Sequence, residues 1–155
     1  MGLEIERKFL VDHGKWNKID KPAGTHYRQG YILSDKEHTV RVRISDKQCW
    51  INLKSKSSNM SRKEYEYEIP LQDGVEILNS FTKNGTEKVR YRIAFGDKLW
   101  EVDEFLGNNS GLIVAEIELE SEDEEFIKPA WITVEVTDDG RYTNAALAKH
   151  PFKDW

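Results

Sequence analysis

Short stretches in which apolar and polar residues alternate recur along most of this chain. Between residues 39 and 45, for example, Val40 and Val42 alternate with Arg41 and Arg43. Successive side chains of a strand point to opposite faces, so each such stretch predicts a strand with one apolar and one charged face. Eight strands are predicted in this way, over residues 4–11, 27–33, 39–45, 49–55, 62–69, 86–94, 99–105 and 112–120.

Signals for helices are fewer. Apolar residues spaced three apart predict a helix that begins at Asp73 or Gly74 and ends before Gly85. The sequence Ser121-Glu122-Asp123-Glu124 is typical of a capping box and predicts a short helix there. Further short elements are expected: helices over 12–20 and 144–150, and a last strand over 131–136. The pattern therefore indicates a mainly β (α+β) fold, and no linker divides residues 1–155, which we expect to form one domain.

Two architectures satisfy this alternation. A β-sandwich would bury the apolar faces between two sheets and leave the charged faces in water. A closed eight-stranded antiparallel barrel would turn the charged faces into a polar tunnel and cover its apolar outside with the few helices. The pattern alone does not separate the two.

The signs of the charges favour the barrel. On a solvated sheet opposite charges usually mix, because they pair across strands and like charges repel. In this sequence the signs are segregated by strand. The cationic rows contain Arg41, Arg43, Lys54, Lys88, Arg90 and Arg92, and the anionic rows contain Glu4, Glu6, Glu64, Glu66, Glu101, Asp103, Glu116 and Glu118.

The residue types in these rows suit metal and phosphate chemistry. Carboxylates at positions i and i+2 have Cβ atoms about 7 Å apart, so both can reach one divalent ion or two neighbouring ions. Oxygen ligands without cysteine or histidine favour Mg²⁺ or Mn²⁺ over zinc. The arginine and lysine rows suit a multiply charged anion such as a triphosphate. The sequence has no P-loop motif, so side chains on strands would hold that anion.

Composition narrows the classes of partner. The net charge of −5 disfavours general binding to nucleic acid. Cys49 is the single cysteine, so an internal disulfide framework is excluded. No apolar run is long enough to span a bilayer, and the first residues are charged where a signal peptide would be apolar. We expect a soluble cytoplasmic protein without a membrane or nucleic-acid partner, and the many aromatic residues are compatible with a homodimer.

The opening Glu4-x-Glu6-x-Lys8 is followed in order by seven further segments: Arg28-Gln29-Gly30-Tyr31, Arg41-Val42-Arg43, Leu53-Lys54-Ser55, Ser61-Arg62-Lys63-Glu64-Tyr65-Glu66, Glu87-Lys88-Val89-Arg90-Tyr91, Glu101-Val102-Asp103 and Glu116-Ile117-Glu118. In these motifs and their order, over nearly its whole length, the chain resembles the CYTH, or triphosphate tunnel metalloenzyme, family. Members of that family enclose a polar tunnel in an eight-stranded antiparallel barrel and act on triphosphates with a divalent metal.

The resemblance implies a role for each matching residue. The metal ligands would be Glu4, Glu6, Glu116 and Glu118, with Asp103 and Glu64 or Glu66 completing or orienting the shell. The phosphates would be held by Arg41, Arg43, Lys54, Arg62, Lys88 and Arg90. Lys8, beside the catalytic acidic pair, would contact the phosphate being lost or its bridging oxygen. Tyr31 would assist proton transfer, although a packed aromatic side chain explains it equally well.

These roles imply a divalent-metal-dependent triphosphatase that hydrolyses inorganic triphosphate, with water attacking the terminal phosphorus. A class IV adenylate cyclase, or a thiamine or nucleoside triphosphatase, of the same family is the first alternative. A non-catalytic module that binds polyphosphate or phosphorylated ligands is the second. The short connections leave little material for a nucleoside pocket, which favours the small inorganic substrate.

Overall fold

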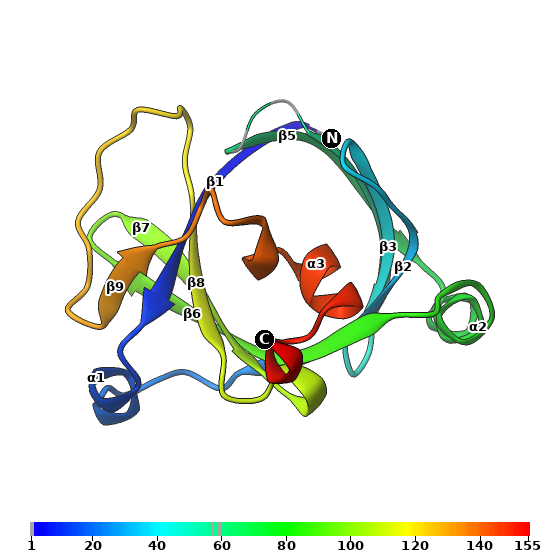
Figure 1. Ribbon diagram of the computed structural model, residues 1–155, viewed down its shortest axis with the longest axis horizontal. Helices are drawn as coiled ribbons and strands as arrows, with labels where there is room; N and C mark the ends of the chain where they lie inside the picture. Colours follow the sequence, from blue (N-terminus) through cyan, green and yellow to red (C-terminus); the bar gives the residue numbers. More distant parts are fainter. Residues whose placement is uncertain (1, 57, 59) are drawn as a thin grey trace.

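The computed structural model describes residues 2–56, 58 and 60–155, and in it one antiparallel sheet closes on itself as a barrel (Figure 1). Its strands are β1 (Gly2–Val11), β2 (Thr25–Ser34), β3 (His38–Ile44), β4 (Cys49–Lys56), β5 (Ser61–Ile69), β6 (Gly85–Phe95), β7 (Lys98–Phe105), β8 (Ile113–Glu118) and β9 (Ile132–Glu135). The strand order is β5-β4-β3-β2-β6-β7-β8-β1, and pairing of β1 with β5 closes the barrel. The predicted eight-stranded closed barrel is therefore confirmed.

Strand β1 has three partners. Its first half pairs with β5, with Glu4 opposite Arg62, and its later residues pair with β8, with Lys8 opposite Glu116. Strand β9 is the additional ninth strand and pairs with the last part of β1, where the register shifts between Phe9 and Val11. Because each end of β1 joins a different neighbour, this strand closes the barrel and also connects it to the chain packed outside.

The helices are short and lie close to their predicted positions. They are α1 (His13–Lys18), α2 (Leu71–Phe81) and α3 (Asn144–Lys149), with 3₁₀ turns η1 (Gly107–Asn109), η2 (Gly140–Tyr142) and η3 (Phe152–Asp154). The helix predicted to open at Ser121 is wrong. The Ser121 hydroxyl donates to the Asp123 carboxylate (2.9 Å), and Glu124 accepts from the backbone N–H of Glu120 (2.7 Å). These local hydrogen bonds satisfy the turn without a helix.

The main apolar core lies outside the barrel wall. Strands β1, β7 and β8 turn Phe9, Trp100 and Ile117 away from the tunnel, and all three are fully buried. Trp16 of α1 and Trp131, just before β9, cover them. Edge-to-face contacts join the rings, with centroids 5.6 Å apart for Phe9 and Trp100 and 5.1 Å apart for Trp16 and Trp131. This core packs against the outside of the barrel and stabilises one side of it.

Helix α2 covers a second part of the outside, over β2, β3 and β4 (Figure 1). Its Leu78 packs in a small buried cluster with Val42 and Cys49. Gly74 permits this close approach, because a Cβ atom at this position would lie 2.0 Å from the sulfur of Cys49. The apolar faces of these strands are thus covered by a helix, as a barrel with a charged interior requires.

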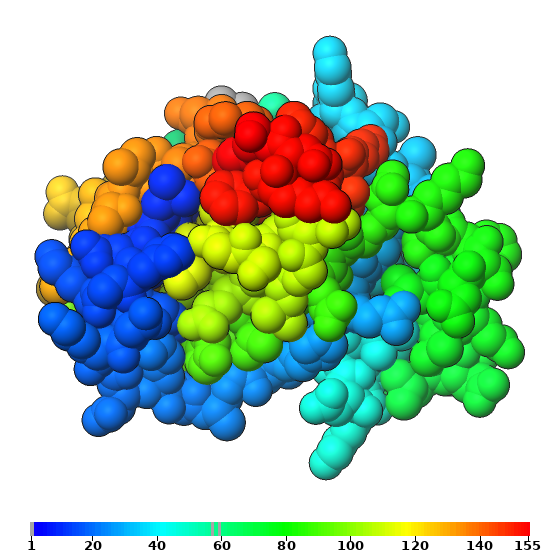
Figure 2. Space-filling model, turned by 60° about the horizontal axis from the view of Figure 1, so that its bottom comes forward, coloured from blue at the N-terminus to red at the C-terminus, as the bar shows by residue number. Residues whose placement is uncertain are grey.

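The last residues of the chain lie at one end of the barrel. Helix α3 falls within the circular outline of the barrel in Figure 1, and its Leu147 packs with Phe105, Leu112 and Val114. Figure 2 shows the red C-terminal segment seated on the yellow-green surface around η1. Lys149 donates to the backbone carbonyl of Ser34 (2.7 Å), at the end of β2. Among the described helices, none combines the length and the apolar character needed to cross a membrane.

Candidate active site

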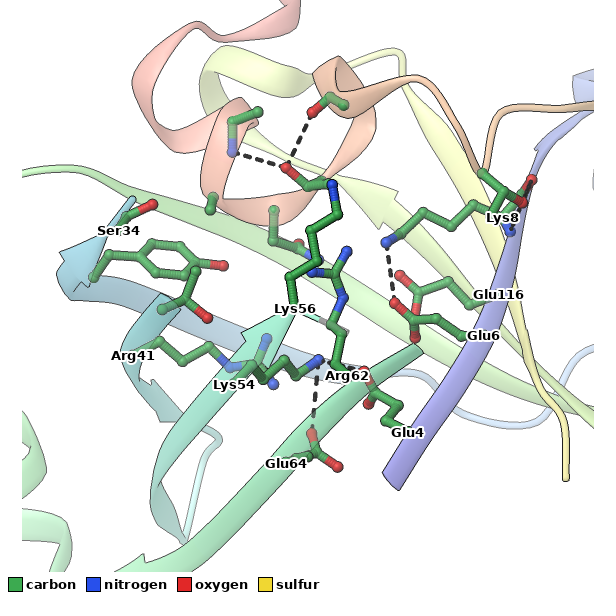
Figure 3. A pocket seen from close by; sticks show the side chains of 18 of the residues that line it. Glu4, Glu6, Lys8, Ser34, Arg41, Lys54, Lys56, Arg62, Glu64 and Glu116 are labelled. Carbon is green, nitrogen blue, oxygen red and sulfur yellow. Dashed lines mark hydrogen bonds and ion pairs between the residues drawn. The ribbon is translucent and has the colours of Figure 1, made fainter. Parts of the chain in front are cut away.

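A cavity of about 880 Å³ runs inside the barrel. Most of the residues predicted from the sequence as site residues line it: Glu4, Glu6, Lys8, Tyr31, Arg41, Arg43, Lys54, Arg62, Glu64, Glu66, Arg90, Glu116 and Glu118. Figure 3 shows side chains from several strands converging on this space. The charged faces of the strands therefore face one another across an enclosed space. The architecture is the closed barrel and not the sandwich.

Glu6, Lys8 and Glu116 form one group on the wall, built by the pairing of β1 with β8 (Figure 3). The ammonium of Lys8 donates to the Glu6 carboxylate at 3.0 Å. Burial raises the pKa of Glu6, but the charges of Lys8 and Lys54 outweigh burial and bring this pKa well below its usual range. Burial and the charge of Glu6 raise the pKa of Glu116. One carboxylate of this pair is thus ionised while the other retains a proton more readily.

Glu4, Lys54 and Glu64 form a second group, where β1 meets β5 and β4. The Lys54 ammonium lies 2.9 Å from Glu4 and 3.6 Å from Glu64. Burial raises the pKa of Glu4 to about 7, against the opposing charge of Lys54. Asn52, buried beneath, donates to both Glu64 and Glu66 at 2.9 Å. Burial also raises the pKa of Glu118, on the neighbouring strand β8, so this part of the cavity is rich in acidic groups.

Several cations on β3, β4 and β5 have few carboxylate partners. The closest carboxylate to the Arg41 guanidinium is that of Glu66, at 3.9 Å, and the buried Nε atom of Arg41 has no hydrogen-bond partner within the described residues. Arg62 and Lys56 form no ion pair with any described residue. Burial, together with Arg41 and Arg90, lowers the pKa of Arg43 to about 9. Cationic groups with free N–H donors inside a cavity are what an anionic ligand requires.

Arg90 differs, because a buried carboxylate holds it. Asp103 accepts from the Nε and one terminal nitrogen of Arg90 at 2.7 and 2.8 Å, and from Lys88 at 2.7 Å. Burial raises the pKa of Asp103, but the charges of these two cations outweigh burial and lower it. Burial and the charge of Arg90 lower the pKa of Lys88 to about 7. Arg90 reaches the cavity, but Lys88 and Asp103 are buried in the wall and do not line it.

Some other residues that line the cavity had no role predicted from the sequence. Lys56 lies two residues after Lys54 on β4, so the period of two could have found it. Asn144 and Lys149 reach the cavity from α3, and Asn144 accepts from Lys88 at 3.2 Å. No periodicity signals their position, because it depends on how α3 docks on the barrel. Tyr31 lines the cavity half-buried, as either of its two interpretations allows.

The carboxylate oxygens that line the cavity are suitable ligands for a divalent metal. Within residues 2–56, 58 and 60–155, no three histidine, cysteine, aspartate or glutamate side chains already converge as a metal-binding group. Glu6 and Glu116 are nevertheless close enough to perturb each other's ionisation, and Glu4 and Glu118 line the same cavity. Carboxylate oxygens without sulfur or imidazole are the ligand set of hard cations. A cation would also relieve the repulsion between these acidic groups.

A closed antiparallel barrel with a charged interior, rows of cations and paired carboxylates defines the class of triphosphate tunnel proteins. The CYTH domain matches residues 2–145, and the chain belongs to the CYTH family, which implies a divalent metal.

Two curated relatives share this length. An inorganic triphosphatase of Acetivibrio thermocellus is 47% identical over 156 residues, covering 100% of this chain and 99% of the relative. An inorganic triphosphatase of Nitrosomonas europaea is 36% identical over 152 residues, covering 94% of this chain and 96% of the relative. A crystal structure of an inorganic triphosphatase is 35% identical, with a TM-score of 0.66, and 94% of this chain and 93% of that chain are covered.

Proposed function

We propose that this chain is a divalent-metal-dependent hydrolase of inorganic triphosphate. The observation that carries the proposal is the arrangement of one cavity, in which poorly compensated cations of β3, β4 and β5 share the space with carboxylates of β1 and β8. The names of the two curated relatives and of the solved structure, all inorganic triphosphatases, support the same substrate.

The substrate would be bound by side chains that project from strands. Arg41 and Arg43 present planar guanidinium groups to phosphate oxygens, and Lys54, Lys56 and Arg62 add further donors from neighbouring strands. Triphosphate carries several negative charges along its length, so a row of cations matches it better than a single site would. Burial strengthens these contacts, because the cavity screens charge less than bulk water does.

The metal would be held by Glu6 and Glu116, with Glu4 and Glu118 as neighbouring donors, and we propose Mg²⁺ or Mn²⁺ from this oxygen ligand set. When bound, such an ion neutralises phosphate charge and makes a water molecule more acidic for attack on the terminal phosphorus. The Lys8 ammonium, 3.0 Å from Glu6, can donate to the terminal phosphate or to the bridging oxygen that leaves with pyrophosphate.

The direct experiment measures phosphate release from inorganic triphosphate, ATP and thiamine triphosphate, each with Mg²⁺ and with Mn²⁺. We expect inorganic triphosphate to give the highest kcat/KM. Glu6→Gln should lower this value by about 10²–10³-fold, whereas the exposed Glu125→Gln should not change it. Preference for ATP with cyclic product would establish the cyclase alternative. Binding of triphosphate without turnover under any metal would establish the binding module.

A further inference from the structure

Three buried arginines, Arg41, Arg43 and Arg90, reach the cavity, and the chain holds the last two in opposite ways. The Arg90 guanidinium has a carboxylate partner, since Asp103 accepts from it at 2.7 and 2.8 Å. The Arg43 guanidinium has an amide partner, since Nε donates to the side-chain oxygen of Gln29 at 3.0 Å. In the part of the chain that the structure describes, no carboxylate lies within ion-pair distance of Arg43. The charge of Arg90 is balanced, and that of Arg43 is not.

Gln29 lies behind Arg43 and not on the surface of the internal cavity. It projects from β2, opposite Arg43 on β3 in the register of the two strands, and is only 2% exposed. The ring of Tyr27, two residues earlier, lies 4.9 Å from the Arg43 guanidinium carbon. Gln29 and Tyr27 therefore support the guanidinium from the wall, and neither carries a negative charge.

The choice of an amide at position 29 is costly in the free protein. The Gln29 Nε2 atom is buried and has no hydrogen-bond partner among the described residues, which is unfavourable. A glutamate of the same size would have no such unpaired N–H group and would form a stronger, charge-assisted bond with Arg43. The other charged groups near Arg43 are the cations Arg41, Arg90 and Lys88 and the acids Asp103 and Glu66. A neutral acceptor thus leaves an excess of positive charge beside the cavity.

We propose that Gln29 is a positioning residue, which fixes the Arg43 guanidinium with a neutral acceptor so that its charge remains available to the phosphate oxygens of inorganic triphosphate. This inference rests on the proposed function. The bound substrate supplies the negative charge that Arg43 lacks, and Asp103 supplies it permanently for Arg90. Arg43 then contributes to the affinity for a polyanion, and Arg90 contributes mainly to the structure of the wall.

The first test replaces Gln29 with glutamate, which preserves shape and the acceptor and changes only charge. We expect Gln29→Glu to raise KM for inorganic triphosphate about 10-fold or more with little change in kcat, and to weaken triphosphate binding measured by calorimetry without metal by a similar factor. Gln72→Glu is the matched control: it makes the same chemical change in the exposed first turn of α2 and should behave as the wild type. A KM equal to that of the wild type, or a fall in kcat alone, would overturn the inference.

A second test does not depend on that variant. Gln29→Met removes the acceptor without adding charge, and we expect a several-fold rise in KM that is smaller than that of Gln29→Glu. Since Gln29 acts only through Arg43, this effect should vanish when Arg43→Met is already present. Additive effects in this double-mutant cycle would contradict the proposal. A wild-type protein that neither binds nor hydrolyses triphosphate would instead remove the proposed function itself.

Discussion

The inside and the outside of this barrel are made by the same strands, yet they differ in almost every physical property. On β1 the inner residues Glu4, Glu6 and Lys8 are charged, whereas Phe9, on the outer face of the same strand, is fully buried in an apolar core. Ordinary globular proteins place the apolar residues at the centre. In this protein the centre is polar, and the packing that holds the barrel together lies between its outer wall and the segments that cover it.

The inner face binds the ligand and the outer face stabilises the fold, so the two tasks fall on opposite sides of the same strands. Burying clustered charges is unfavourable unless they are paired or meet a ligand, so the inner face contributes little to stability. The outer face buries aromatic rings such as Trp16 and Trp100, each of which contributes substantially to folding. Substitutions on the two faces should consequently have separable effects, the inner ones on turnover and the outer ones on unfolding.

The largest effect is expected at Glu116, on the inner face. Glu116→Ala removes one carboxylate of the pair that we propose as metal ligands, and kcat/KM for inorganic triphosphate should fall by about 10³-fold. The unfolding free energy from urea titration should stay close to that of the wild type, because the lost group is a buried acid whose charge is already disfavoured. Near-normal hydrolysis by this variant would remove the metal assignment.

On the outer face, Trp100→Ala should lower the unfolding free energy by about 3–5 kcal/mol. The indole is fully buried and contacts the rings of Phe9, Phe126 and Trp131. Urea unfolding measures the loss, and activity per folded molecule should be retained because the ring faces away from the cavity. If this variant were stable but inactive, the separation of the two faces would be wrong.

A smaller loss is expected where α2 approaches the barrel. Gly74→Ala places a methyl group against the sulfur of Cys49 and should destabilise the protein by about 1–3 kcal/mol. Gly14→Ala in α1 is the matched control, since its new Cβ would lie at an ordinary 3.5 Å from Asp12. That control should be neutral or stabilising by up to about 1 kcal/mol, as helix propensity predicts. Equal effects of the two substitutions in thermal unfolding would argue against a close approach at Gly74.

The smallest effect concerns pH and Lys88, which is buried within the wall. Its pKa is lowered by burial and by Arg90 to about 7, so above this pH the folded protein has released a proton that the unfolded chain still binds. Stability therefore rises with pH, by about 1 kcal/mol from this group between pH 6 and 8. Lys88→Met should remove this share of the rise in urea titrations at the two pH values. An unchanged slope in the variant would show that Lys88 stays charged throughout.

The strands could be predicted because alternation reports directly on which face a side chain occupies. The segregation of sign, for instance Arg41 and Arg43 on one strand and Glu116 and Glu118 on another, also pointed correctly to an enclosed polar space. Closure itself was not visible in any local pattern, since it depends on the pairing of β1 with β5, and those two strands lie far apart in the sequence.

The sequence predicted neither how deeply Lys88 is buried nor where α3 docks, and the two reasons are related. Lys88 shares the phase of Arg90, yet it is buried in the wall and Arg90 reaches the cavity, because a period of two gives the face and not the depth. Asn144 and Lys149 line the cavity only because α3 docks at one end of the barrel. The helix expected at Ser121 failed because its polar side chains bind neighbouring groups instead.

The pairing of β1 with β8 has a consequence for how the protein is made. A ribosome adds about 5–20 residues per second, so β8 emerges on the order of ten seconds after β1. During that interval one edge of β1 lacks its partner strand β8, and the apolar side chains of β1 are not yet covered by the segments that bury them in the folded protein. Contacts between such distant segments slow folding, so the barrel can close only after β8 has been synthesised.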